Sequence, residues 1–321
     1  MTFEFASPHT LDEALRLWQP DARWFAGGTD LVPEIKSELA APTRLINLKT
    51  IPELSGIAET ERGLRLGGLA TLTELGAHPG IRQRYPALAE SCDLAASPQL
   101  RNVATLGGNL NQDSRCAYYR GEFNCWLKGG STCYMREGEN REAAIFGYHD
   151  CVHVHPSDPA NALIAFDATL TLHSATGSRE LSVGEFFRTP TGDDRRLNDR
   201  RPDEIITEIH LPKFSNSRSV YLKEMDRAAW GFALVSVAVR LDFDGEKISD
   251  ARLVLGGVAP TPWRVPDAER LLVGQTLSPD LAARAAEAAI QNAQPLAHNA
   301  YKIRLAKALV KRAILSKTDA V

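Results

Sequence analysis

The amino-acid sequence predicts an α+β protein with more than one hydrophobic core. The chain has 321 residues, above the roughly 250–300 at which a single core stops growing. Short strand patterns alternate with helix patterns over its first two thirds, and a pair of long strand patterns, 233–242 and 247–258, precedes two helix patterns. These observations divide the chain into three blocks, the second beginning near Pro52 and the third near Val220.

The first block predicts a small β-α-β-type unit. The letters T-L-D-E at Thr10–Glu13 form a capping box at the start of a helix. A strand is expected at 23–26, a helix from Leu31 and a second strand at 44–48, with the letters GGTD at the turn between the first strand and the helix.

The second block combines further helices with strands. A strand at 64–69 leads into a helix that begins with T-L-T-E (Thr71–Glu74), and 81–96 is expected to be mostly helical. A second glycine pair follows, in the letters NVATLGGNL. The pattern at 162–173 is rich in strand-forming residues.

The third block predicts a hairpin and two helices. Asp244-Gly245 is a favourable hairpin turn between the two long strands. Ser278 is the expected N-cap of a helix with Pro279 at its first position. The last helix, about 300–315, carries basic side chains that we expect to face solvent; a docking surface for an acidic partner is the less favoured interpretation.

Charge and hydropathy exclude several classes of function. The 37 basic and 40 acidic residues give a net charge of −3, which does not indicate a nucleic-acid or anionic-membrane partner. No apolar run approaches the roughly 20 residues that span a bilayer. The first ten residues lack the basic and apolar regions of a secretory signal. We therefore expect a cytoplasmic protein, with export to the periplasm alongside a signal-bearing partner as the alternative.

Two glycine loops are candidate anion-binding sites. A Gly pair after a strand allows a sharp turn and lets backbone N–H groups converge, and the start of a helix adds its positive dipole end. Thr29 and Thr105 can add hydroxyl donors, and Asp30 or Asn109 can fix the loop or a ribose. Two such loops would suit a pyrophosphate held from two sides, although Gly-Gly is more often a plain turn. Neither a G-x-G-x-x-G nor a G-K-[ST] motif is present.

Four of the five cysteines are clustered in sequence. They follow the pattern C-x8-C-x7-C-x17-C, and clustered thiols in a reducing compartment are more often metal ligands than disulfides. Four thiolates are the usual complement of an iron–sulfur cubane, whereas zinc sites usually pair cysteines two to four residues apart. Iron–sulfur is therefore favoured, with zinc and unligated thiols as alternatives. The four candidate ligands are Cys116, Cys125, Cys133 and Cys151.

Two further groups of residues beside these ligands are expected to have structural roles. Cys92 is expected to be a buried helix thiol that packs as a small apolar group. The histidines near the fourth cysteine are expected to support the site or to lie at the surface rather than to ligate metal; they are His149, His153 and His155.

Several stretches together resemble one protein family. FAGGTDLVPEIK, SPQLRNVATLGGNL, HPSDPANAL, YLKEMDRAAWGFALVSVAV and GGVAPTPWRVPDAERLLVG occur in this order. They are similar to the flavoprotein (medium) subunits of the molybdenum hydroxylases, the xanthine dehydrogenase and carbon monoxide dehydrogenase group. The resemblance implies a vanillyl-alcohol-oxidase-type (PCMH-type) FAD domain over 1–215, with subdomains of about 1–52 and 53–215. A C-terminal domain like that of the carbon monoxide dehydrogenase flavoprotein would follow over 216–321.

The resemblance also implies which residues contact FAD. The first glycine loop would wrap the pyrophosphate, the second would complete the clamp, and later stretches would lie near the flavin ring. The residues so implied are Phe25, Ala26, Gly27, Gly28, Thr29, Asp30 and Leu31; Thr105, Gly107, Gly108 and Asn109; Ser157 and Asp158; Ile206, against the isoalloxazine; and Lys223. One departure is that Trp230 and Gly231 stand where the family commonly has acidic residues.

The clustered cysteines lie in a segment that most members of the family lack. This segment, about 112–155, is similar to the insert that holds a [4Fe–4S] cluster in 4-hydroxybenzoyl-CoA reductase and in a bacterial periplasmic aldehyde oxidoreductase. The letters RCAYYR, GGSTC and GENREAAIFGYHDCVHVHPSD favour the aldehyde enzyme. The resemblance therefore implies that the four clustered cysteines ligate such a cluster.

The resemblance implies an electron-transfer subunit with two partners, a large molybdopterin-binding subunit and a small subunit with [2Fe–2S] clusters. Electrons would pass through the partner clusters to FAD and on to an acceptor such as ferredoxin. A subunit of a 4-hydroxybenzoyl-CoA-reductase-like enzyme or of an N-heterocycle dehydrogenase is an alternative. A non-redox, zinc-stabilised interaction module and a stand-alone flavin oxidase are the others.

Overall fold

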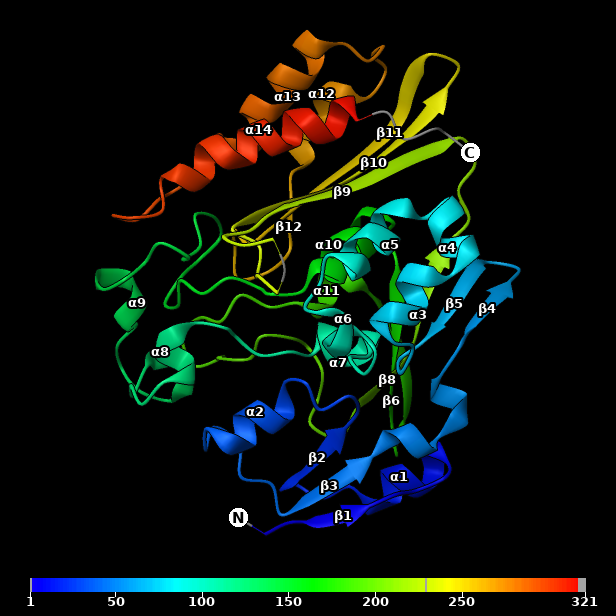
Figure 1. Ribbon diagram of the computed structural model, residues 1–321, viewed down its shortest axis with the longest axis vertical. Helices are drawn as coiled ribbons and strands as arrows, with labels where there is room; N and C mark the ends of the chain where they lie inside the picture. The colour runs from blue at the N-terminus through cyan, green and yellow to red at the C-terminus, as the bar shows by residue number, and fades with distance from the viewer. Residues whose placement is uncertain (1, 229, 317–321) are drawn as a thin grey trace.

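The computed structural model describes residues 2–228 and 230–316, and three sheets run from the N-terminal to the C-terminal end of the molecule (Figure 1). The first sheet is parallel and has the strand order β1–β3–β2. Helix α1 (Leu11–Leu17) packs with this sheet in a small core, and α2 (Leu31–Lys36) connects β2 to β3. The strands are β1 (Glu4–Ala6), β2 (Ala22–Phe25) and β3 (Arg44–Asn47), followed by the short turns η1 (Leu48–Thr50) and η2 (Pro52–Leu54).

The second sheet is antiparallel, with the order β4–β5–β8–β6–β7. Its strands are β4 (Ile57–Thr60), β5 (Gly63–Gly67), β6 (Thr169–Ser174), β7 (Gly177–Ser182) and β8 (Ile205–Pro212). Short helices pack against it: α3 (Leu72–Ala77), α4 (Pro79–Arg84), α5 (Pro86–Asp93), α7 (Leu106–Leu110), α10 (Asp158–Ala165) and α11 (Val183–Phe186); α6 (Pro98–Arg101) contacts α3 and buries no side chain.

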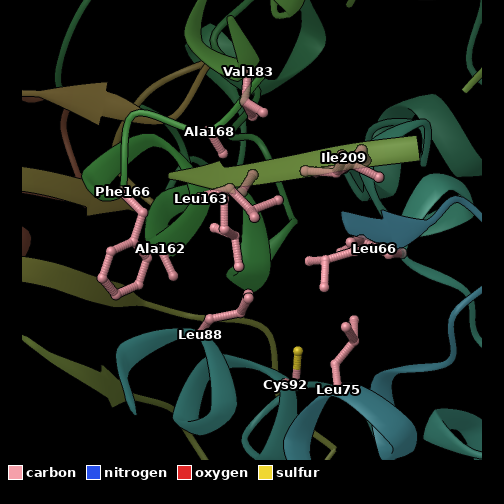
Figure 2. Packing of buried hydrophobic residues seen from close by; sticks show 14 of the residues in the cluster. Leu66, Leu75, Leu88, Cys92, Ala162, Leu163, Phe166, Ala168, Val183 and Ile209 are labelled. Carbon is pink, nitrogen blue, oxygen red and sulfur yellow. The ribbon is translucent and has the colours of Figure 1, made fainter. Parts of the chain in front are cut away.

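The core between this sheet and its helices contains the fifth cysteine. Cys92 on α5 points among apolar side chains that include Leu66, Leu75 and Leu88 (Figure 2). It is fully buried, and burial raises the pKa of its thiol well above the ordinary range. The interpretation of Cys92 as an inert structural thiol agrees with this environment.

The segment 112–155, called the insert below, contains only single helical turns. These are α8 (Ala117–Arg120), η3 (Trp126–Lys128) and α9 (Tyr134–Glu137). The insert lies at one side of the molecule, with α8 close to α2 of the N-terminal unit (Figure 1). A small apolar cluster of Met135, Ala143 and Val152 forms its interior.

The C-terminal part is an antiparallel sheet, order β12–β11–β10–β9, covered on one face by three helices (Figure 1). This arrangement confirms the α+β class and the predicted sheet-and-helix domain. The strands are β9 (Ser217–Glu224), β10 (Val235–Asp244), β11 (Lys247–Gly256) and β12 (Trp263–Arg264); the helices are α12 (Pro266–Leu272), α13 (Pro279–Ile290) and α14 (Tyr301–Leu315).

Local differences from the expected elements have simple causes. The pattern at 162–173 begins as helix α10 and becomes strand only at β6, because the Ser157 hydroxyl accepts from the backbone N–H of Ala160 and Pro159 suits the first helical turn. At the first capping box, Thr10 accepts from the Glu13 N–H as expected, but Glu13 accepts from His9 instead of Thr10. In the part of the chain that the structure describes, no helix has the length and apolarity to span a membrane.

Candidate functional site

The two predicted glycine loops lie against each other. A Cβ atom added to Gly27 would lie 2.0 Å from the backbone oxygen of Val103, so only glycine permits this approach. Gly28 has φ +71°, in the left-handed region that glycine adopts without strain. In the same way, a Cβ on Gly107 would lie 2.9 Å from the backbone oxygen of Gly68. The loops therefore meet through close backbone contacts.

A cavity of about 510 Å³ opens where these loops meet. The backbone N–H groups of residues 27–30 find no acceptor among residues 2–228 and 230–316, so they are free to bind an anion. Most of the predicted FAD residues line this cavity: Ala26, Gly27, Gly28, Thr29, Asp30, Leu31, Thr105, Gly107, Gly108 and Ile206.

The second glycine loop offers fewer free hydrogen-bonding groups to this cavity than the sequence predicts. The Thr105 hydroxyl accepts from the Gly108 N–H at 3.2 Å and caps α7, so these two groups satisfy each other. Asn109 accepts a 2.5 Å hydrogen bond from the Ser157 hydroxyl through its side-chain oxygen. The free backbone donors at this cavity therefore come from the first glycine loop, and the second loop supports it.

Phe25 lies outside the group of cavity-lining residues. Its ring packs edge-on against Phe5, at 5.7 Å between centroids, with the Lys49 ammonium 4.9 Å from the ring centre. It also lies beneath Gly28, whose added Cβ would be 2.8 Å from the ring. Phe25 thus supports the turn from behind.

A second cavity, of about 380 Å³, lies between the insert and the loop that joins β9 to β10. Its walls combine predicted flavin residues, one predicted cluster ligand and exposed aromatic side chains. They include Ser157, Asp158, Cys116, Arg115, His153, Asn161, Trp230 and Phe232. Trp230 has φ +54° and is 59% exposed. This residue, which stands where the family commonly has an acidic one, therefore lies at the rim of the second cavity.

Asp158 and Lys223 form a buried ion pair beside this second cavity. The Lys223 ammonium donates to Asp158 at 2.7 Å, and the Tyr221 hydroxyl donates to the other carboxylate oxygen at 2.5 Å. Burial raises the pKa of Asp158, and the charge of Lys223 opposes that rise. The two residues, predicted separately, are brought together at one end of α10.

Some polar groups at the second cavity have no partner in the part of the chain that the structure describes. Both ring nitrogens of the buried His153 and the side-chain oxygen of Asn161 are in this state. Burial lowers the pKa of His153 to about 4, so its imidazole is neutral at pH 7. Buried polar atoms without partners carry a free-energy cost, and these three are available to a bound group.

The four clustered cysteines lie close enough to affect one another electrostatically. The neighbouring Cys151 thiol lowers the pKa of Cys133 to about 6, and Cys133 in turn raises the pKa of Cys151. Burial raises the pKa of Cys116, and the neighbouring Cys133 and Cys125 raise it further. Within the described residues, no three His, Cys, Asp or Glu side chains converge closely enough to hold a metal ion.

Sequence reasoning missed several residues at the first cavity. Glu34, Arg200 and Gly68 line it. Arg200 is fixed by a 3.0 Å bond to the Asn111 side chain and by bonds to three backbone carbonyls. The letters RLGGLA contain a third glycine pair, which was a usable signal for Gly68; no motif marked Arg200.

Comparison with known proteins agrees with this geometry. Residues 1–214 match the FAD binding domain in molybdopterin dehydrogenase, and residues 220–317 match the CO dehydrogenase flavoprotein C-terminal domain. The aldehyde oxidoreductase FAD-binding subunit PaoB of Escherichia coli strain K12 is 36% identical over 295 residues, covering 90% of this chain and 89% of that protein. The carbon monoxide dehydrogenase medium chain of Hydrogenophaga pseudoflava is 29% identical over 320 residues, covering 97% and 96%.

A solved structure of a related protein has the same fold. Carbon monoxide dehydrogenase from Hydrogenophaga pseudoflava superimposes with a TM-score of 0.77 at 27% identity, covering 98% of this chain and 96% of that one. Two matching domain models in the expected order, together with a relative above 30% identity over most of both chains, establish the relationship. The chain belongs to the family of FAD-binding medium subunits of the molybdenum hydroxylases, a family of oxidoreductase subunits.

Proposed function

We propose that this chain is the FAD- and [4Fe–4S]-containing electron-transfer subunit of a heteromeric molybdenum hydroxylase of the aldehyde oxidoreductase type. A large molybdopterin-binding subunit would carry the substrate chemistry, and a small [2Fe–2S] subunit would connect it to this chain. The relative at 36% identity, an aldehyde oxidoreductase FAD-binding subunit, supports the choice of type.

The observation that carries the proposal is the group of free backbone N–H donors at residues 27–30 beside the first cavity. Converging N–H groups bind phosphate oxygens, so this loop fits the pyrophosphate of FAD. Residues 107 and 108 approach from the other side, and Ile206 offers an apolar wall. FAD, when bound, supplies the redox chemistry; the chain's residues hold it and exclude water.

A hydrogen bond connects the walls of the two cavities and supports the second cavity as the position of the flavin ring. The bond from Ser157 to Asn109 joins the second glycine loop to the start of α10, where Ser157 and Asp158 line the second cavity. The unpartnered atoms of His153 and Asn161 fit the polar edge of an isoalloxazine, which presents hydrogen-bonding nitrogen and oxygen atoms. The ring would then lie within reach of the Asp158–Lys223 pair.

Four mutually interacting thiols in the insert support the cluster. A single ion needs ligands that converge on one point, whereas a cubane places its irons and sulfides between the thiolates and so holds them farther apart. The ligands would be Cys116, Cys125, Cys133 and Cys151. Because Cys116 also lines the second cavity, the cluster would lie beside the flavin. An external one-electron carrier such as ferredoxin is the acceptor that this arrangement favours.

The proposal is tested by the iron, acid-labile sulfide, zinc and flavin content of anaerobically purified full-length protein. We expect one FAD and about four irons and four sulfides per chain, the complement of one cubane. Cys125→Ser should lose the iron and its visible absorption, whereas Cys92→Ser, which removes a thiol remote from the insert, should keep both. Zinc without flavin would overturn the proposal and favour the zinc-stabilised module.

A further inference from the structure

Asp30 joins the first glycine loop to the insert. One oxygen of its carboxylate accepts from the backbone N–H of Asp113 at 2.8 Å. The other oxygen accepts from Arg120 at 2.9 Å and lies 2.9 Å from the guanidinium of Arg115. The Asp30 side chain is 16% exposed, and both of its carboxylate oxygens have partners in the insert. Its role is therefore to position the loop.

The same bonds extend to a predicted cluster ligand. Arg120 donates through its Nε to the Ser114 carbonyl at 2.7 Å, and the Ser114 hydroxyl accepts from the Cys116 N–H at 3.2 Å. Arg120 also lies 3.3 Å from Glu34, on the helix that follows the loop. One connected set of bonds thus runs from the side chain of Asp30, in the loop that carries the free N–H groups, to the backbone of Cys116.

The insert has little structure of its own to keep these bonds in place. Its helices are single turns, and its interior is a small apolar cluster. A group bound by its cysteines would restrict the conformations of this segment and so hold Arg115, Arg120 and the Asp113 amide against Asp30. A loop that is already fixed loses less conformational entropy when it binds its ligand.

We propose that Asp30 couples the two cofactor sites, so that a cluster in the insert raises the affinity of the first glycine loop for FAD. This inference rests on the proposed function. Coupling between two sites is reciprocal, so bound FAD raises the affinity of the insert for its cluster by the same factor. Asp30 is the positioning residue, and its partners in the insert transmit the effect.

The test measures FAD affinity by quenching of flavin fluorescence, using full-length protein with its cluster and the same protein stripped of iron by a chelator. We expect about tenfold tighter binding with the cluster present, within the usual range of site–site coupling. Equal affinities would overturn the coupling and leave the proposed function intact. Failure of both forms to bind FAD would instead overturn the proposed function.

The variant Asp30→Asn tests whether Asp30 is the residue that couples the two sites. It weakens the charged contacts to both arginines, and we expect the ratio of the two affinities to fall toward one. Glu4→Gln is the matched control, because it removes a carboxylate–arginine pair (Glu4–Arg44) of the same unit that touches neither cavity; its ratio should stay near ten. Arg120→Gln gives the same comparison if the first variant does not fold. A tenfold ratio retained in the Asp30 or Arg120 variant would overturn the assignment.

Discussion

Glu34 is the residue whose ionisation is most altered at the first cavity. Burial is the main cause that raises its pKa, from 4.5 to about 8, and the neighbouring carboxylates Asp30 and Asp113 add to it. Arg120, 3.3 Å away, opposes the rise. At pH 7 this carboxyl is therefore mostly protonated, which limits negative charge beside the site proposed for a pyrophosphate.

The altered pKa predicts how stability depends on pH. The unfolded chain releases this proton near pH 4.5, whereas the folded chain keeps it until about pH 8, so the contribution of Glu34 to stability is lost as pH rises through that window. Glu34→Gln should therefore gain stability relative to the wild type as pH rises from 5 to 8. Urea unfolding at several pH values measures this difference.

A control separates this effect from the general loss of a carboxylate. Glu180→Gln removes an exposed carboxylate on β7 that faces Arg62 at 3.4 Å. The pH-dependent gain should be specific to Glu34→Gln. The same profile in both variants would contradict the assignment of the effect to the buried site.

At the scale of elements, the glycine loops act through the close approach of backbones. Residue 27 lies against the backbone of Val103, and residue 107 lies against that of Gly68. The first contact joins the N-terminal unit to the middle unit, and the second fixes α7 within the middle unit, both at the wall of the first cavity. The loops therefore join two units and line the first cavity, where we propose that they bind the pyrophosphate.

Gly27→Ala should weaken FAD binding by at least tenfold, about 1.4 kcal/mol. The added Cβ would lie 2.0 Å from the Val103 oxygen, so one loop must move and the free N–H groups must lose their common direction. Equilibrium titration with FAD measures the affinity. Gly184→Ala is the matched control, because the nearest atom to its added Cβ is 4.0 Å away; equal affinities in the two variants would contradict this account.

At the scale of the whole molecule, α14 of the C-terminal domain anchors the insert at residues 142–143. Lys302, expected from the sequence to face solvent with the other basic residues of this helix, is instead fully buried. Its side-chain nitrogen donates to the carbonyls of Glu142, Ala143 and Gly257, at 2.7–3.0 Å. Asn299 donates to the Ala143 carbonyl from the same region. The insert is thus held by the C-terminal domain at residues 142–143 and by the Asp30 bonds near its start.

Lys302→Met should lower the free energy of unfolding by about 2–3 kcal/mol, because it leaves buried carbonyls without their donor. It should also speed proteolytic cleavage within 112–155, since that segment loses its anchor. Denaturant titration and limited proteolysis measure the two effects. Lys307→Met, on the same helix but paired with Glu287 at the surface, should change neither; an unaltered Lys302→Met protein would contradict the anchoring role.

Sequence patterns were sufficient to predict those elements whose conformation depends on residues close to them in the chain. The hairpin at Asp244-Gly245 and the helix capped by Ser278 depend on neighbours within a few residues, whereas the second glycine pair, expected in a turn, lies in helix α7. The resemblance to a family, which the matching domain models bear out, rested on motifs of the same short range. Local chemistry also indicated the four clustered cysteines, whose role remains a prediction.

Tertiary structure decided the relations between distant segments. Residues 30 and 113, residues 158 and 223, and residues 142 and 302 meet only because three sheets and their connections bring them together. Asp30, expected to fix its own loop or a ribose, turned out to bond the insert 83 residues away. The sequence determined by itself which turns, caps and thiols exist, because those are short-range properties. Which of them share a cavity depends on contacts that no local pattern encodes.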